Sequence, residues 1–201
     1  MSRTLGLTLM FVLLAPVAWA QETPRVEVFA GGSYAHEAIS DIKFVNGLGW
    51  HASFFENVNG WFGAGIDVSG HFSSPKVNLG MFRPTPIDSR AFTYLFGPRF
   101  SYRGWTHLRP YAEALVGVDT LRVIPKASAL KPVSLTTFAG AFGGGIDVAI
   151  NSRFALRLIQ ADYVLTRFRE FDSTTGAFDG PHRMQNNIRA SAGVVFRFGQ
   201  R

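Results

Sequence analysis

The sequence predicts an all-β fold, namely an eight-stranded antiparallel up-and-down transmembrane β-barrel. Three observations lead to this fold class. The segment Ile188–Gly199 alternates between apolar side chains and a face that contains Arg189 and Arg197. The same alternation recurs in seven other segments, and the connections between segments are alternately short and long. Because successive side chains of a strand point to opposite faces, each segment has one face suited to hydrocarbon and one suited to a polar interior.

The composition agrees with a protein that crosses a membrane with strands. Hydrophobic residues make up 47% of the 201 residues and charged residues only 17%, whereas about 25% is typical of soluble domains. The formal net charge is +6. The arginines are scattered through the predicted strands without a basic cluster, so we expect no nucleic-acid partner. The chain has no cysteine, which excludes a disulfide framework and thiolate metal sites.

Residues 1–20 are typical of a secretory signal peptide. Arg3 supplies the positive start, Leu5–Val17 the apolar core, and Ala18-Trp-Ala20 a cleavage motif. The apolar core is shorter than the roughly 20 residues that a spanning helix needs. We therefore expect cleavage after Ala20, export to the cell outer membrane, and a barrel domain over residues 21–201.

The strands are assigned from their alternation with a period of two residues. Two positions depart from it. Arg157 and Gln160 both belong inside, although they differ in parity: one residue number is odd and the other even, so a regular strand would place them on opposite faces. This conflict predicts a β-bulge near Leu158–Gln160. Pro98 lies within a strand, where it removes a ladder donor, so a second bulge is expected there. The predicted strands are Arg25–Ala35, Gly47–Glu56, Trp61–Phe72, Ala91–Arg103, Pro110–Arg122, Phe138–Ile150, Phe154–Thr166 and Ile188–Gly199.

The lengths of the connections predict the orientation of the barrel. Those after the second, fourth and sixth strands are short, and outer-membrane barrels have short periplasmic turns and longer external loops. Outward aromatic residues also fall near both ends of the strands, as two interfacial girdles would require. The short connections are Asn57–Gly60, Gly104–Leu108 and Asn151–Arg153; the long ones are His36–Asn46, Ser73–Arg90, Val123–Thr137 and Arg167–Asn187.

The inward faces carry equal numbers of acids and bases. An eight-stranded barrel has room only for side chains, and charges removed from water must be paired. We therefore predict a ladder of arginine–carboxylate bridges that fills the lumen. The expected members are Asp67, Glu113, Asp119, Asp147 and Asp162 with Arg99, Arg103, Arg157, Arg189 and Arg197, assisted by Phe29, Phe55, Tyr111 and Leu115.

Other functions remain open at this stage. A narrow ion pathway through the lumen is one. Phe142-Gly-Gly-Gly145 superficially resembles a phosphate loop, but no Gly-Lys-Ser/Thr follows, so close packing against a crowded lumen is the better interpretation. A soluble lipocalin-type carrier would need an apolar interior, and ten charges cannot line such a cavity without a large penalty.

The chain resembles the OmpA-like outer-membrane β-barrel proteins. The motifs that carry the resemblance are Tyr94–Tyr102, Gly143–Val148, Arg157–Tyr163 and Gly193–Phe198. The resemblance implies an eight-stranded barrel folded by the barrel-assembly machinery, with outer-membrane lipid and lipopolysaccharide as partners. It also implies a structural or surface-interaction role, with no catalytic, cofactor-binding or metal-binding residues expected and the extracellular partner unknown.

An outer-membrane enzyme acting on lipid A is the alternative from a different class. Lipid A deacylases are also eight-stranded barrels and use a His-x-Ser pair that faces lipid. His71-Phe-Ser73 has this spacing, but the alternation directs His71 inward. A lumen histidine next to Asp67 is therefore expected instead.

The four long loops carry more basic than acidic residues. One hypothesis is that this excess contacts lipopolysaccharide phosphates or another anionic surface polymer, but an ordinary solvated loop surface is the favoured interpretation, because exposed charges are the norm. The basic residues are Lys43, Lys76, Arg83, Arg90, Lys126, Lys131, Arg167, Arg169 and Arg183.

Overall fold

Strands account for nearly all of the regular structure. The computed structural model describes residues 23–37, 45–74, 76–77, 85–126, 132–169 and 182–200. Within these ranges, no helix is long and apolar enough to cross a membrane. The strands are β1 Pro24–Glu37, β2 Val45–Asn57, β3 Phe62–Ser73, β4 Lys76–Val77, β5 Thr85–Ser101, β6 Leu108–Pro125, β7 Val133–Ala149, β8 Phe154–Arg169 and β9 His182–Gln200.

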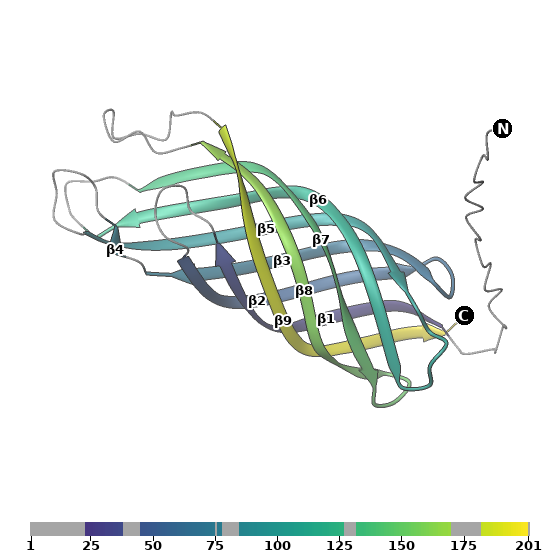
Figure 1. The fold of residues 1–201 in the computed structure, drawn as a ribbon. Coiled ribbons are helices and arrows are strands. Elements are labelled where there is room, and N and C mark those ends of the chain that lie inside the picture. Colours follow the sequence, from purple (N-terminus) through teal and green to yellow (C-terminus); the bar gives the residue numbers. More distant parts are fainter. Residues whose placement is uncertain are drawn as a thin grey trace, which may run out of the picture.

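Eight of these strands form a closed antiparallel ring, which confirms the predicted fold class (Figure 1). Each strand pairs with the next along the chain, β3 pairs with β5, and β1 pairs with β9 to close the barrel. The unpredicted strand β4 pairs only with Thr85 and Pro86 of β5. The short turns after β2, β5 and β7 lie at one end of the barrel together with the start of β1 and the end of β9. We call this the turn end and the opposite one the loop end.

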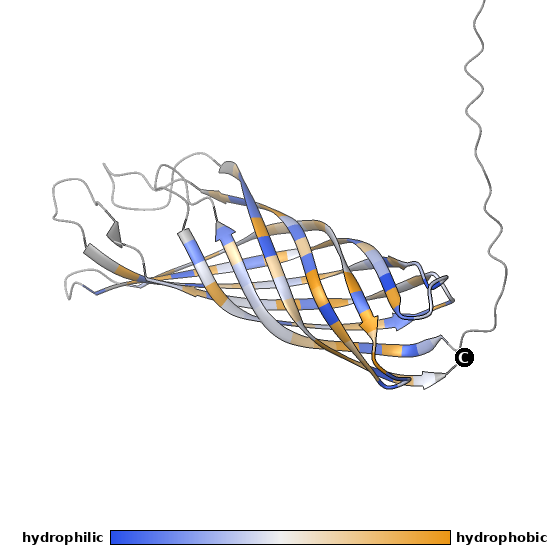
Figure 2. Cartoon of the chain, turned by 60° about the horizontal axis from the view of Figure 1, so that its bottom comes forward, coloured by the Kyte–Doolittle hydropathy of each residue, from blue (hydrophilic) through white to orange (hydrophobic). Residues whose placement is uncertain are grey.

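The predicted alternation holds around the barrel. Phe54, Ile66, Phe96 and Val116 all point outward with 43% to 60% of their surface exposed. Buried positions between them carry polar or charged side chains, and hydrophilic and hydrophobic bands alternate along the strands in Figure 2. The outside is therefore apolar and the inside polar, which is the reverse of a soluble lipocalin-type carrier.

The predicted bulge in β8 is confirmed. Leu158 and Ile159 both point outward, and both flanking residues, Arg157 and Gln160, are fully buried. The register of β8 shifts at this point against both of its neighbours, β7 and β9. The extra residue changes the parity of the strand, so that Arg157 and Gln160 reach the same lumen.

The bulge predicted at Pro98 is wrong. Pairing with β3 runs through Gly97 and Pro98 without interruption. Pairing with β6 is interrupted at these two residues but resumes at Arg99 opposite Glu113 in an unchanged register. Because proline lacks only its N–H, the ladder loses a local hydrogen bond without needing an extra residue.

Most strand ends at the loop end lie farther out than the alternation predicts. Spanning strands need only about 9–11 residues, whereas β9 has 19. Its first segment, 182–187, pairs with β8 alone. On their outward face, the outer parts of the strands carry polar pairs such as Thr120 and Thr136, whose hydroxyls lie 3.1 Å apart. The apolar outer surface therefore ends before the strands do. At the turn end most boundaries agree within two residues, and β5 stops at Ser101, so that Arg103 lies outside it.

Candidate functional site

The lumen is the candidate functional site, and its charges are paired between neighbouring strands. Arg99 lies opposite Glu113, Asp147 opposite Arg157, Asp162 opposite Arg189, and Glu27 opposite Arg197. Opposite charges at directly paired positions stabilise a sheet. The strand register therefore brings each of these four arginines next to a carboxylate.

Three of the four pairs are close and hydrogen-bonded. Arg99 donates from Nε and Nη2 to Glu113 Oε2 at 2.9 and 2.7 Å. Arg157 donates to both oxygens of Asp147 at 2.8 and 3.1 Å. Arg189 Nε donates to Asp162 Oδ2 at 2.9 Å. The predicted ladder of bridges is confirmed for these members, all of which are buried.

Gln160 connects the three pairs into one network. Its carbonyl oxygen accepts hydrogen bonds from Tyr111 Oη at 2.8 Å and from Arg157 Nη1 at 2.6 Å. Its amide nitrogen donates to Glu113 Oε1 at 2.8 Å and to Asp162 Oδ2 at 2.9 Å. The bulge in β8 is what places this side chain inside, so an irregularity of one strand completes the network.

Arg189 carries the network across the lumen to β3. Its Nη1 donates to Asp67 Oδ1 at 2.7 Å and to Ser69 Oγ at 3.0 Å. Asp67 is also hydrogen-bonded to His51 Nε2. Charged side chains from non-neighbouring strands thus meet inside the barrel, as expected for an eight-stranded lumen with room only for side chains.

Aromatic rings cover the faces of two guanidinium groups. Arg99 Cζ lies 3.5 Å from the centroid of the Phe55 ring and 4.3 Å from that of Tyr111. Arg157 Cζ lies 4.3 Å from the centroid of Phe29 and 4.6 Å from that of Tyr111. Cation–π contacts of this kind strengthen when they are desolvated. The predicted role of these rings as lumen fillers is confirmed.

The glycines at 143–145 make room for the network. A side chain at Gly143 would collide with Asp162, and one at Gly145 would lie 2.6 Å from Tyr111 Oη. Glu113 and Asp162 flank Gly143 in the ladder. These positions lie within β7, so the interpretation as close packing against the lumen is confirmed.

His71 lies inside the barrel, as predicted, but its partner is different. Its Nε2 lies 2.9 Å from Ser33 Oγ, which in turn accepts a hydrogen bond from Ser191 at 3.0 Å. The histidine bonded to Asp67 is His51 of β2, which is paired with Ser69 and reaches Asp67 two residues further along β3. A lipid A deacylase would need the histidine of its His-x-Ser pair on the outer face, whereas His71 is only 4% exposed.

Three of the ten expected members of the ladder form no hydrogen-bonded ion pair with any described residue. Arg103 and Arg197 both lie near Glu27, at 3.6 and 3.5 Å, without a hydrogen bond to it. Within the described part of the chain, Asp119 has no ion pair and accepts a hydrogen bond from Thr93 at 3.3 Å. The reason is position: no arginine of a neighbouring strand lies opposite Asp119, which pairs with Thr93 and Thr137.

Sequence reasoning missed three lumen residues. Glu27 and His51 are 5% and 1% exposed, and Arg109 interacts electrostatically with Arg103, Arg197 and Glu27. Parity would have found all of them. Glu27 shares the parity of Phe29, His51 that of Phe55, and Arg109 that of Tyr111.

Apolar residues fill the lumen on both sides of the network. One cluster contains Phe55, Leu95, Leu115, Ala139, Ala141 and Val164, a second, toward the loop end, contains Ala91, Leu121 and Phe168, and a third, toward the turn end, contains Phe29, Ala155 and Val195. Among the described residues, no group of three histidine, cysteine or acidic side chains could hold a metal ion.

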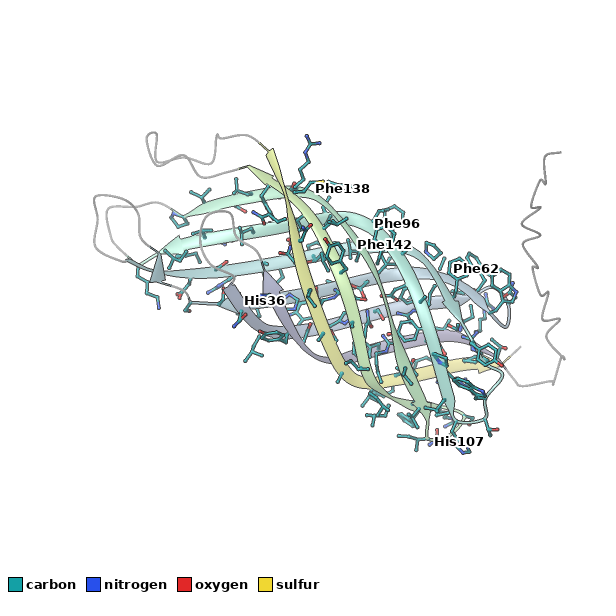
Figure 3. The ribbon with its side chains drawn as sticks, in the orientation of Figure 1. His36, Phe62, Phe96, His107, Phe138 and Phe142 are labelled. Carbon is teal, nitrogen blue, oxygen red and sulfur yellow. The ribbon has the colours of Figure 1, made fainter. Side chains whose placement is uncertain are left out.

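The outside carries aromatic residues at both ends. Near the turn end, Phe62 lies with its ring centroid 5.5 Å from that of Phe100. Near the loop end, the rings of Phe72 and Phe92 are 6.0 Å apart. Figure 3 shows Phe62, Phe96, Phe138 and Phe142 on the outer surface, with His107 at the turn end and His36 toward the loop end. The predicted girdles thus have described members at both ends.

The basic residues of the long loops are only partly described. Arg90 and Arg167 are exposed. Lys126 forms an exposed ion pair with Asp88 at 3.1 Å, and the hydrogen bonds from Ser74 and Lys126 lower the pKa of Asp88. Lys43, Arg83 and Lys131 lie outside the described residues, and only the backbones of Lys76, Arg169 and Arg183 are described.

A closed eight-stranded ring with an apolar outside and a charged, filled inside is the fold of outer-membrane β-barrels. Solved structures agree. Neisserial surface protein A matches with a TM-score of 0.62 and 13% identity, over 89% of this chain and 99% of that one. Ail, the attachment invasion locus protein of Yersinia pestis, matches with a TM-score of 0.53 and 14% identity, over 87% and 99% of the two chains. At these identities the likeness concerns the fold.

A second structure of Ail, in complex with the heparin analogue sucrose octasulfate, matches with a TM-score of 0.56 and 14% identity, over 86% of this chain and 97% of that one. No protein-family model matches the chain, and the search of curated proteins returned no match.

Proposed function

We propose that this chain is an OmpA-like protein of the cell outer membrane that has a structural or surface-interaction role and no catalytic activity. The observation that carries the proposal is the division of the barrel into an apolar outside and a charged lumen filled by the network around Gln160. An apolar outer wall can face the hydrocarbon of a membrane, and the charges of the lumen are paired with one another rather than hydrated. Residues 1–20 would be removed as a signal peptide, and the barrel-assembly machinery would insert residues 21–201.

Heat-modifiable gel migration tests this proposal. The protein is taken from isolated outer membranes and run with and without boiling. A closed barrel resists the detergent until it is heated, so we expect the unboiled protein to migrate at a different apparent size. Recovery from the soluble periplasmic fraction would contradict the proposal.

A narrow pore is the second candidate function, because the lumen is lined with charge. The contacts of Arg189 with both Asp162 and Asp67 argue against it, since they join strands that are not neighbours. Single-channel recording in a planar bilayer separates the two. Steps of stable conductance would favour the pore, and their absence the closed barrel.

The basic excess of the loop end supports a surface-interaction role with an anionic partner. We propose lipopolysaccharide phosphates or another anionic surface polymer as this partner. Ail has been crystallised with a sulfated heparin analogue, which is a ligand of the same charge. Neutralising Arg167, Arg169 and Arg183 together should weaken binding to lipopolysaccharide micelles at low salt, where exposed charges act most strongly. Unchanged binding would exclude these residues.

A further inference from the structure

We propose that the turn end of the lumen contains a binding site for a phosphate dianion, formed by Arg103, Arg109 and Arg197 around Glu27. The site lies at the opposite end of the barrel from the basic loops and goes beyond the function proposed above. Arg109 belongs to β6, Arg197 to β9 and Glu27 to β1. Arg103 follows β5 and is held by a hydrogen bond from its Nη1 to Gly60 O at 2.6 Å.

The first argument is charge. The acids near these three guanidinium groups are Glu27 and Asp147. Both oxygens of Asp147 already accept hydrogen bonds from Arg157. Three cations therefore share the one remaining carboxylate, Glu27. The cluster has an excess of two positive charges, which one dianion would neutralise.

The second argument is the number of buried donors without a partner. Ten buried side-chain nitrogen and oxygen atoms of the described residues have no hydrogen-bond partner, and six of them belong to this cluster. They are Arg103 Nε and Nη2, Arg109 Nε, and all three guanidinium nitrogens of Arg197. Buried polar groups in native proteins are nearly always satisfied, by protein, water or an ion.

The third argument is the geometry around Glu27. Its two oxygens lie 3.5 Å from Arg197 Nε and 3.6 Å from Arg103 Nη2, too far for hydrogen bonds. The Arg197 side chain is 1% exposed and that of Arg103 is 7% exposed. Guanidinium groups present planar forks of donors that match the oxygens of a phosphate group. A phosphate would supply the acceptors that Glu27 alone does not.

The position of the cluster identifies the side from which the ligand comes. Arg109 is only partly buried, and the turns after β2 and β5 lie next to the cluster, at the end opposite to the long connections (Figure 1). The ligand is therefore inorganic phosphate or a small phosphomonoester from the aqueous phase at the turn end.

Calorimetric titration of the full folded chain with inorganic phosphate tests the site. The protein is held in an uncharged maltoside detergent, in chloride buffer of matched ionic strength near pH 7.5, where most inorganic phosphate and nearly all of a phosphomonoester is dianionic. We expect saturable binding to one site. Arg197→Gln should weaken it about tenfold or more, because a charge-assisted hydrogen bond is lost. Arg153→Gln is the matched control: it removes an exposed positive charge at the same end and should leave binding unchanged.

Glu27→Gln gives the opposite expectation. It removes the competing carboxylate, so phosphate should bind about tenfold more tightly. Arg197→Gln should still fold without phosphate, because it relieves repulsion between like charges. If Glu27→Gln folds only when phosphate is present, that rescue supports the site directly.

Three results would overturn the proposal: no saturable heat with phosphate, equally tight binding of acetate, or equal weakening by Arg153→Gln. Glycerol 3-phosphate and phosphatidic acid in mixed micelles distinguish the sources of phosphate. Binding of the soluble ester supports the aqueous ligand. Binding of the lipid alone would overturn that assignment.

Discussion

Single side chains decide whether the buried polar groups of this lumen have hydrogen-bond partners. Gln160 is the clearest case, because four groups of the network meet at its amide. Val116 is the counterpart on the outside, where only an apolar side chain suits hydrocarbon. Substitutions at these two residues test the inner and outer faces separately.

Gln160→Leu should lower the free energy of unfolding by about 3–5 kcal/mol. The change leaves Glu113 and Asp162 short of a donor, and Arg157 and Tyr111 short of an acceptor, and buried charges without partners are expensive. Urea unfolding of the barrel in lipid vesicles measures the effect. Gln185→Leu, at a half-buried position of β9, is the control and should cost far less. Similar losses for both variants would mean that Gln160 is not the centre of the network.

Val116→Arg should destabilise the inserted barrel by about 2–4 kcal/mol, the cost of a charge near the bilayer midplane. Ile150→Arg, also outward but in a short turn, should cost about 0–1 kcal/mol because it lies near the interface. Gly117→Arg points inward and should be governed by crowding against the backbone of β5, since the new Cβ would collide with Tyr94 O and lie 3.0 Å from Leu95 Cα. Folding into vesicles of two bilayer thicknesses separates the two causes, since the cost of Val116→Arg should depend on the bilayer and the crowding cost of Gly117→Arg should not.

At the scale of the strand, the alternation of the sequence decides which side chains share the lumen. A bulge is required where two inward residues differ in parity, and this conflict was visible in the sequence at Arg157 and Gln160. At Pro98 there was no such conflict. Only a donor was missing, and the register did not change. A conflict of parity between inward residues was therefore a reliable predictor of a bulge, and the loss of a backbone N–H was not.

Deleting Ile159 should remove the bulge and still allow the heat-modifiable barrel to form. Without the extra outward residue, Arg157, Leu158 and Gln160 alternate in, out and in, and the register of β8 becomes continuous against β7 and β9. Deleting Ala161 is the contrasting variant: it makes the inward residues Gln160 and Asp162 adjacent, so one of them must turn toward the hydrocarbon and the barrel should not form. The readout for both variants is the gel shift on boiling. Failure of the Ile159 deletion to fold would show that the bulge itself is required.

For the whole molecule, the sequence determined the number of strands, their faces and the orientation of the connections, because each follows from a local pattern. It did not determine which charges meet. The contact between Arg189 and Asp67 depends on strands that are not neighbours, and the pairing of His51 rather than His71 with Asp67 depends on the register of β2 against β3. The outer ends of the strands were missed because their outward positions are polar, such as Thr120 and Thr136, while a small apolar cluster of Ala91, Leu121 and Phe168 lies inside.

The stability of the whole barrel should depend little on salt. The pairs that hold the lumen together are buried, and buried pairs are screened far less than exposed ones. The exposed pairs, Arg25 with Glu56 and Lys126 with Asp88, contribute little in any case. Raising sodium chloride from about 50 to 500 mM should leave the urea midpoint nearly unchanged. A marked fall would mean that the lumen is open to ions.

The pairing of charges between neighbouring strands has a consequence for how the barrel is assembled. Arg99 and Glu113 belong to one hairpin, and Asp147 and Arg157 to the next along the chain. Each of these two ion pairs can therefore enter the hydrocarbon already formed within its own hairpin. The seam between the first and last strands is different, because its ion pair is the long one between Glu27 and Arg197. Closure of the ring is the step that gains least from electrostatic attraction, so it depends on the backbone ladder.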